Sequence, residues 1–166
     1  MSKSFVTESA EELYAIAEMD IKTVDSLLTK PKYPEDQMYT IICFHATQAV
    51  EKFLKGYIIN NGKKIEKTHN LDHLHKAAME IDISFSKIKN DCVLLNVFVP
   101  DIKYSEQEAI TKQNMNDIIK SLDAICNFPP IKTMRNSFSK ERKYEIVAEV
   151  TASPAKNGKK KNNSLR

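Results

Sequence analysis

The segment from residue 35 to residue 60 most constrains the fold of this chain, because its apolar residues repeat with the period of one long helix. On a helical wheel, a broad arc of this segment is apolar and holds Ile42, Cys43, Ala46, Val50, Phe53, Leu54, Tyr57 and Ile58. A helix that is apolar over most of its girth needs neighbours on several sides. We therefore expect this helix to lie inside a helical bundle.

A narrow polar stripe interrupts the apolar surface of this helix. Its members, which fall within roughly 80° of one another on the wheel, are His45, Gln48, Lys52 and Lys55. One interpretation is that the stripe is the solvent face of an amphipathic helix. The other is that it binds an anionic ligand, because an imidazole and an amide donate and accept hydrogen bonds and two ammonium groups supply charge. Nucleotide phosphates or an RNA backbone would fit the second interpretation.

Four further segments show helical periodicity. They run from about 9 to 28, 71 to 81 and 85 to 98, and from near 105 to the residue before Pro129. Only 3 Gly and 6 Pro argue against a turn-rich all-β protein. We therefore predict an all-α fold, an up-and-down bundle of four to five helices joined by short loops.

Local signals mark several of the expected helix ends. Ser9 and Glu12 have the spacing of a capping box at the start of the first helix. Asp20 is the one exception in the otherwise apolar stripe of that helix. Gly62 suits the left-handed position that follows the long helix.

The chain changes character after Pro130. We divide it into a helical bundle over 7–128, an extension over 129–152 and a disordered tail over 153–166. Within the extension, residues 144–150 alternate between apolar and polar types, which weakly indicates a short strand. The tail is polar and rich in lysine, without residues that could form a core.

Charge is distributed unevenly along the chain. Residues 1–130 hold 15 lysines and no arginine against 19 acidic residues, whereas residues 131–166 hold 7 lysines and 3 arginines against 3 glutamates. The net charge of +3 therefore combines a mildly acidic body with a basic end. That end is either a solubilising tail or a weak, salt-dependent anchor for RNA.

Cysteine and glycine usage restrict the classes of function. The three cysteines, Cys43, Cys92 and Cys126, are far apart within apolar helical runs, which is typical of reduced core residues in a cytoplasmic protein. Neither an N-terminal apolar segment nor a run of membrane-spanning length is present. Glycines stand only at 56, 62 and 158, so no phosphate-binding or dinucleotide-binding loop can be written and no cofactor is expected.

Residues 68–75 contain three of the four histidines. His69 and His73 could share a helix face, but no glutamate or cysteine accompanies them as zinc-site spacing requires, so we predict no metal site. The segment reads better as a helix start, in which Thr68 or Asn70 provides the N-cap. In this interpretation His73 and His75 face water.

Two motifs together resemble the HEPN family, the small helical nucleotide-binding or RNase domains of prokaryotes. They are Phe44-His45-Ala46-Thr47-Gln48-Ala49-Val50-Glu51-Lys52 with Leu54-Lys55, and then Thr68-His69-Asn70-Leu71. The resemblance spans about residues 7–127 and includes the break at Pro100-Asp101. It implies a helical bundle that is usually a homodimer and is often paired with a small nucleotidyltransferase in toxin–antitoxin-like modules.

One expected feature of the family is missing. Many HEPN members cut RNA without a metal, using an arginine followed four to six residues later by a histidine. This chain has no arginine before Arg135 and no histidine after His75, so the motif cannot be written. Lys103 stands where relatives carry an arginine, and it keeps the charge but lacks the bidentate fork that grips phosphate.

We therefore predict a cytoplasmic HEPN-like protein that binds a nucleotide or RNA and has no catalytic residues. The candidate ligand-binding residues are those of the stripe, with two lesser candidates: His45, Gln48, Lys52, Lys55, His69 and Lys103. Two alternatives stay open, a divergent metal-independent ribonuclease and a purely structural dimerisation module.

Overall fold

The structure of the protein, a computed structural model, describes residues 4–29, 35–97 and 110–152. These residues form six α-helices and one 3-10 helix: α1 (Ala10–Thr29), α2 (Glu35–Asn60), α3 (Leu71–Met79), η1 (Ile83–Ile88), α4 (Lys89–Asn96), α5 (Lys112–Asn127) and α6 (Pro129–Ala152). The predicted all-α class is confirmed, with one helix more than the four to five expected.

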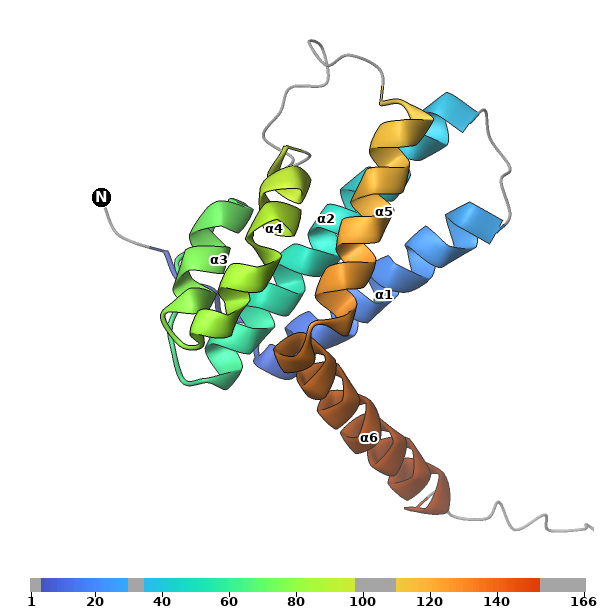
Figure 1. Cartoon of the computed structure of the whole chain (residues 1–166). Helices are drawn as coiled ribbons and strands as arrows, with labels where there is room; N and C mark the ends of the chain where they lie inside the picture. The colour runs from blue at the N-terminus through green and yellow to red at the C-terminus, as the bar shows by residue number, and fades with distance from the viewer. Residues whose placement is uncertain (1–3, 30–34, 98–109, 153–166) are drawn as a thin grey trace, which may run out of the picture.

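Helix α2 is the centre of the bundle, as its apolar girth predicts. It contacts α1, α3, α4, α5 and α6. Figure 1 shows α1, α2 and α5 lying side by side, α3 and α4 packed to one side of them, and α6 leaving the end of the bundle. The α2 side chains Ile42, Phe53, Leu54 and Ile58 are fully buried. Several of the predicted ligand residues therefore lie on a helix that is held in place by contacts with the surrounding helices.

The predicted helix signals are present as hydrogen bonds. Ser9 Oγ accepts from the backbone N–H of Glu12 at 3.1 Å, and the Glu12 carboxylate accepts from the backbone N–H of Ser9 at 2.7 Å. The hydrogen bond from the Ser9 backbone N–H, and then one from the Ser9 side chain, hold the pKa of the Glu12 carboxyl below its ordinary value. Asn70 caps α3 by accepting from the backbone N–H of His73 at 3.1 Å. Gly62 has a φ of 75°, in the left-handed region where glycine avoids the Cβ clash.

The predicted strand at residues 144–150 is wrong, because this segment lies within α6. The first half of α6 packs one face against the core through Ile131, Met134 and Phe138. These residues have the i, i+3, i+7 spacing of a helix face, so their packing favours a helix from its start. The backbone of a helix then forms its hydrogen bonds internally, whereas an isolated strand would have no neighbour to pair with. The predicted disordered tail over 153–166 lies outside the described residues.

Two other predicted helices have different bounds. The segment expected as one helix over 85–98 is divided into η1 and α4. The last bundle helix begins at Lys112 rather than near 105, and Thr111 caps it by accepting from the backbone N–H of Asn114 at 3.2 Å. Ser105 and Lys103 lie outside the described residues.

The prediction that His75 faces water is also wrong. His75 is buried, and its Nε2 donates to the backbone carbonyl oxygen of Phe85 at 2.8 Å. Leu71, Leu74, His75 and Ala78 have the i, i+3, i+4, i+7 spacing of one helix face, and all four are buried. Core packing of the two leucines therefore takes His75 inside, while His73 is exposed as predicted.

The three cysteines are free and buried, as the sequence predicts. Burial raises the pKa of the Cys43 and Cys92 thiols to about 12 and that of Cys126 to about 11, so all three stay neutral at ordinary pH. Among the described helices, none combines the length and apolarity needed to span a bilayer.

Candidate functional site

The polar stripe of α2 does not simply face water, because α1 supplies a carboxylate to it. Asp20 Oδ1 lies 2.8 Å from His45 Nδ1, and Asp20 Oδ2 accepts from Lys52 Nζ at 2.8 Å. Helices α1 and α2 pack closely along their length, which brings Asp20 onto the stripe. The apparent exception in the apolar face of α1 is therefore the partner of two predicted ligand residues.

A second carboxylate, Glu51, holds the other end of the stripe. Its Oε1 accepts from Lys55 Nζ at 2.6 Å, and its Oε2 lies 3.0 Å from Nδ1 of His69, which precedes α3. Gln48 joins the two ends, because it donates to Glu51 at 3.3 Å and accepts from Lys52 at 3.1 Å. The Glu51 side chain is only 4% exposed.

We refer to this hydrogen-bonded set as the polar network; its members are Asp20, His45, Gln48, Glu51, Lys52, Lys55 and His69. It brings together every predicted ligand residue except Lys103, whose position lies outside the described residues. The sequence reasoning missed Asp20 and Glu51 as members. A signal for Asp20 was present, since a carboxylate on a core-facing helix stripe needs a charged or hydrogen-bonding partner.

The carboxylates change the electrostatics expected of the stripe. The two ammonium groups of Lys52 and Lys55 are balanced by Asp20 and Glu51. Lys52 Nζ directs its hydrogen bonds to Asp20 and to the backbone and side-chain oxygens of Gln48. The stripe is therefore a neutralised, partly buried array and not an open line of positive charge.

The two histidines are the accessible ends of the polar network. The side chains of His69 and His45 are 53% and 28% exposed. An ionised carboxylate only accepts hydrogen bonds, so each imidazole donates through Nδ1 to its carboxylate. Each Nε2 then has no hydrogen-bond partner among the side chains that the structure places. A carboxylate-oriented imidazole with an available Nε2 can accept a proton from a ligand or donate one to it.

Metal chemistry has no support in the described ranges, where no group of three or more His, Cys, Asp or Glu side chains is arranged to hold an ion. His69 and His73, weighed above as a metal pair, differ in their environment: His69 binds Glu51, whereas His73 is exposed on α3. The polar network itself is a hydrogen-bonded array of two carboxylates, two imidazoles, two ammonium groups and one amide.

Arg135, the first arginine of the chain, has a structural position away from the polar network. Its Nε donates to Glu18 Oε1 at 2.6 Å and its Nη2 to Glu18 Oε2 at 3.1 Å, and its guanidinium lies 5.2 Å from the ring centre of the buried Phe53. Burial alone would lower the pKa of Arg135, but the hydrogen bonds and negative charge of Glu18 raise it. This arginine therefore ties α6 to α1.

Comparison with known proteins places these residues in a family. A family model described as HEPN domain matches residues 10–134, a range that includes every member of the polar network. No curated protein and no solved structure matches the chain. Because the matched range covers well over half of the sequence, the chain belongs to the HEPN domain family.

Proposed function

We propose that this protein binds a nucleotide or RNA at the polar network and does not cut it. Membership of the HEPN family supports a nucleotide- or RNA-related role. The observation that carries the proposal is a pair of solvent-accessible imidazoles, the exposed His69 and the partly buried His45, each oriented by a largely buried carboxylate. With its Nδ1–H on a carboxylate, a neutral imidazole offers Nε2 as an acceptor for a ribose hydroxyl group, and the protonated ring donates from Nε2 to a phosphate oxygen.

The geometry suggests how a ligand would be held. His45 and Glu51, the partner of His69, are separated by six residues of α2, or about 9 Å of helix rise. The two imidazoles would therefore address different groups of one ligand. Lys52 and Lys55 would keep the two carboxylates charge-balanced, with Gln48 holding Lys52 and Glu51 in place.

The test removes Nε2 while keeping the hydrogen bond to each carboxylate. An asparagine side chain can donate from near the position of Nδ1, so His45→Asn and His69→Asn are the appropriate variants. Titration of ATP, GTP and a short RNA should show at least about tenfold weaker binding in the double variant. The control is His73→Asn, which removes an exposed imidazole outside the network. Equal affinities in all proteins would overturn the ligand assignment.

We also propose that the cytoplasmic protein is a homodimer that acts with a small nucleotidyltransferase. Exposed apolar side chains flank the polar network: Ile16 lies one helical turn from Asp20, and Ile41 lies one turn from His45, each 42% exposed. Light scattering should give twice the monomer mass for the wild type and the monomer mass for Ile16→Glu/Ile41→Glu. Where the adjacent reading frame encodes a small nucleotidyltransferase, its co-expression with this chain should yield a co-purifying complex.

A second function, metal-independent RNA cleavage, is favoured by one observation. The Asp20–His45 and Glu51–His69 pairs have the carboxylate–imidazole arrangement used in general acid–base catalysis. Incubation of RNA with the purified protein in a chelator separates the two functions. Intact RNA after long incubation supports binding alone, whereas cleavage abolished by His45→Asn or His69→Asn establishes the ribonuclease.

A further inference from the structure

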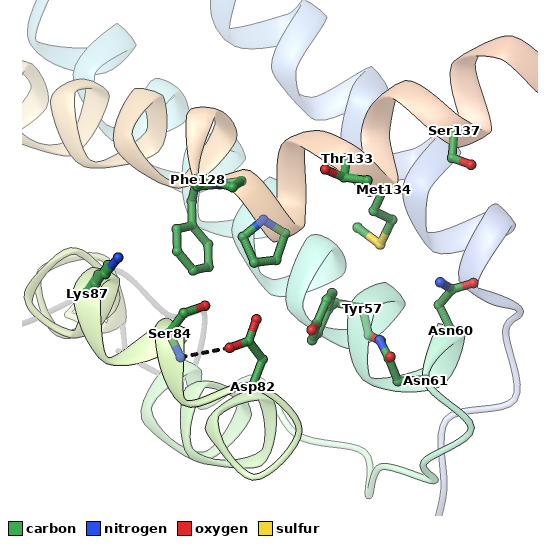
Figure 2. A pocket seen from close by; sticks show the side chains of 12 residues that line it. Tyr57, Asn60, Asn61, Asp82, Ser84, Lys87, Phe128, Thr133, Met134 and Ser137 are labelled. Carbon is green, nitrogen blue, oxygen red and sulfur yellow. Dashed lines mark hydrogen bonds between the residues drawn. The ribbon is translucent and has the colours of Figure 1, made fainter.

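An open pocket lies on the other side of α2 from the polar network. It forms where the end of α2 meets η1 and the start of α6 (Figure 2). Tyr57, which lines it, is nine residues after Gln48 and therefore about 180° away on the helix. The pocket has a volume of about 650 Å³. Small-molecule sites in proteins commonly have volumes of about 300–1,000 Å³.

The floor of the pocket is aromatic and rigidly supported. The ring centres of Tyr57 and Phe85 are 4.6 Å apart, and Phe85 meets Phe128 edge to face at 4.9 Å. Phe128 has an extended backbone between α5 and α6, as expected of a residue before proline. Pro129 and Pro130 continue the lining beside it. The rings are tilted relative to one another, so a planar ring can stack on the face of one lining aromatic and meet the next at its edge.

A carboxylate stands over this floor. Asp82 caps η1 by accepting from the backbone N–H of Ser84 at 2.8 Å, and Figure 2 shows this bond inside the pocket. Hydrogen bonds from the backbone and hydroxyl of Ser84 lower the pKa of Asp82, so the group is ionised at neutral pH. A carboxylate has about four acceptor positions, so Asp82 can still accept from a ligand.

The remaining polar groups of the lining include a second charged side chain. Lys87 lines the pocket with Asp82, so the lining carries one charge of each sign. Burial, and then the negative charge of Asp82, raise the pKa of Tyr57, whose hydroxyl stays protonated. Asn60 adds an amide at the rim, which can donate and accept. Because the lining carries one charge of each sign, its net charge selects neither a cation nor an anion, and a ligand of no net charge is compatible with it.

We propose that this pocket binds a neutral planar heteroaromatic ring with an exocyclic amino group, the chemistry shared by adenine, cytosine and guanine. The ring stacks on the floor beside Tyr57 and Phe128. The amino group donates to Asp82, and the amide of Asn60 contacts the ring edge. A guanidinium group is the competing ligand, since it is also planar, donates hydrogen bonds and would pair with the Asp82 carboxylate, but it is smaller than the pocket.

The decisive variant is Asp82→Asn. Asparagine is as good an N-cap as aspartate, so η1 keeps its cap, while the ligand now meets an amide that can also donate. Calorimetric titration should show that the wild type binds adenosine at least about tenfold more tightly than inosine, which carries a carbonyl in place of the amino group. Asp82→Asn should abolish or reverse that preference. Asp72→Asn, a carboxylate change outside the pocket, should leave it intact.

The same titrations in a His45→Asn/His69→Asn background separate this pocket from the polar network. A preference for adenosine over inosine that survives there and disappears in Asp82→Asn supports the pocket, whether or not the proposed function holds. Four outcomes overturn the proposal: no binding of adenosine, equal binding of adenosine and inosine, an unchanged preference in Asp82→Asn, or tighter binding of agmatine than of adenosine. A Tyr57→Leu variant should weaken both nucleosides, because it removes the stacking surface.

Discussion

Two ion pairs of this protein have the same local geometry in different surroundings. Glu51–Lys55 and Asp72–Lys76 are both i, i+4 pairs with the acid first, and both have N–O distances of 2.6 Å. The Glu51 and Lys55 side chains are 4% and 9% exposed, whereas Asp72 and Lys76 are 38% and 69% exposed. Spacing and distance therefore do not show which pair the fold depends on; burial does.

The largest effect is expected from breaking the buried pair. Lys55→Met keeps most of the apolar stem but leaves Glu51 buried with only Gln48 and His69 as partners. Removing one member of a buried pair typically costs about 3–5 kcal/mol, and we expect about 3 kcal/mol because His69 remains. Urea denaturation monitored by circular dichroism measures this loss in the free energy of unfolding.

A second substitution distinguishes lost charge balance from lost packing. Glu51→Gln in the Lys55→Met protein removes the unpaired charge and should restore part of the stability. If Glu51→Gln instead destabilises the Lys55→Met protein as much as it destabilises the wild type, the two side chains contribute by packing. The contrast with the exposed pair would then have no electrostatic basis.

An intermediate effect is expected at Arg135, whose side chain is 25% exposed. Arg135→Lys keeps the charge but loses the two parallel hydrogen bonds to Glu18 and the flat contact with Phe53. We expect a loss of about 1–2 kcal/mol in the free energy of unfolding. A variant as stable as the wild type would show that charge alone ties α6 to α1.

Lys76→Met should have a small effect, at most about 0.5 kcal/mol, because an exposed i, i+4 pair is well hydrated. In 1 M salt, where the screening length falls to about 3 Å, even this difference should vanish, while the effect of Lys55→Met should persist. Denaturation of each variant at low and high salt provides the measurement. Equal salt sensitivity of the two variants would contradict the assignment of Lys55 as a buried charge.

The sequence predicts elements within one helix better than contacts between helices. The bounds of α2, the Ser9–Glu12 capping box and the core positions of α2 follow from spacing along the chain. The same spacing places His45, Gln48, Lys52 and Lys55 on one stripe but cannot tell what lies over it. That depends on the rotation of α1 about its axis, which brings Asp20 onto the stripe.

The wrong predictions share a physical cause. His75 is polar, yet the packing of Leu71 and Leu74 takes it into the core, where a carbonyl oxygen satisfies it. Residues 144–150 alternate, yet Pro129 stands at the first position of α6, where proline favours a helix start. In both cases a short pattern of polar and apolar residues is outweighed by the structure around it: core packing for His75, and the start of α6 for residues 144–150. Lys103 and its surroundings lie outside the described residues, so its predicted role stays a prediction.

The smallest effect concerns the titration of Asp72. The hydrogen bond from Lys76 holds the pKa of Asp72 below its ordinary value. A depressed carboxyl pKa stabilises the folded state above the pKa of the unfolded chain, about 3.9, and this stabilisation disappears as the pH falls through the folded-state pKa. The stability difference between the wild type and Lys76→Met should therefore close in acid. Carboxyl NMR titration should show the pKa of Asp72 rising in Lys76→Met; an unchanged value would assign the shift to other groups around α3.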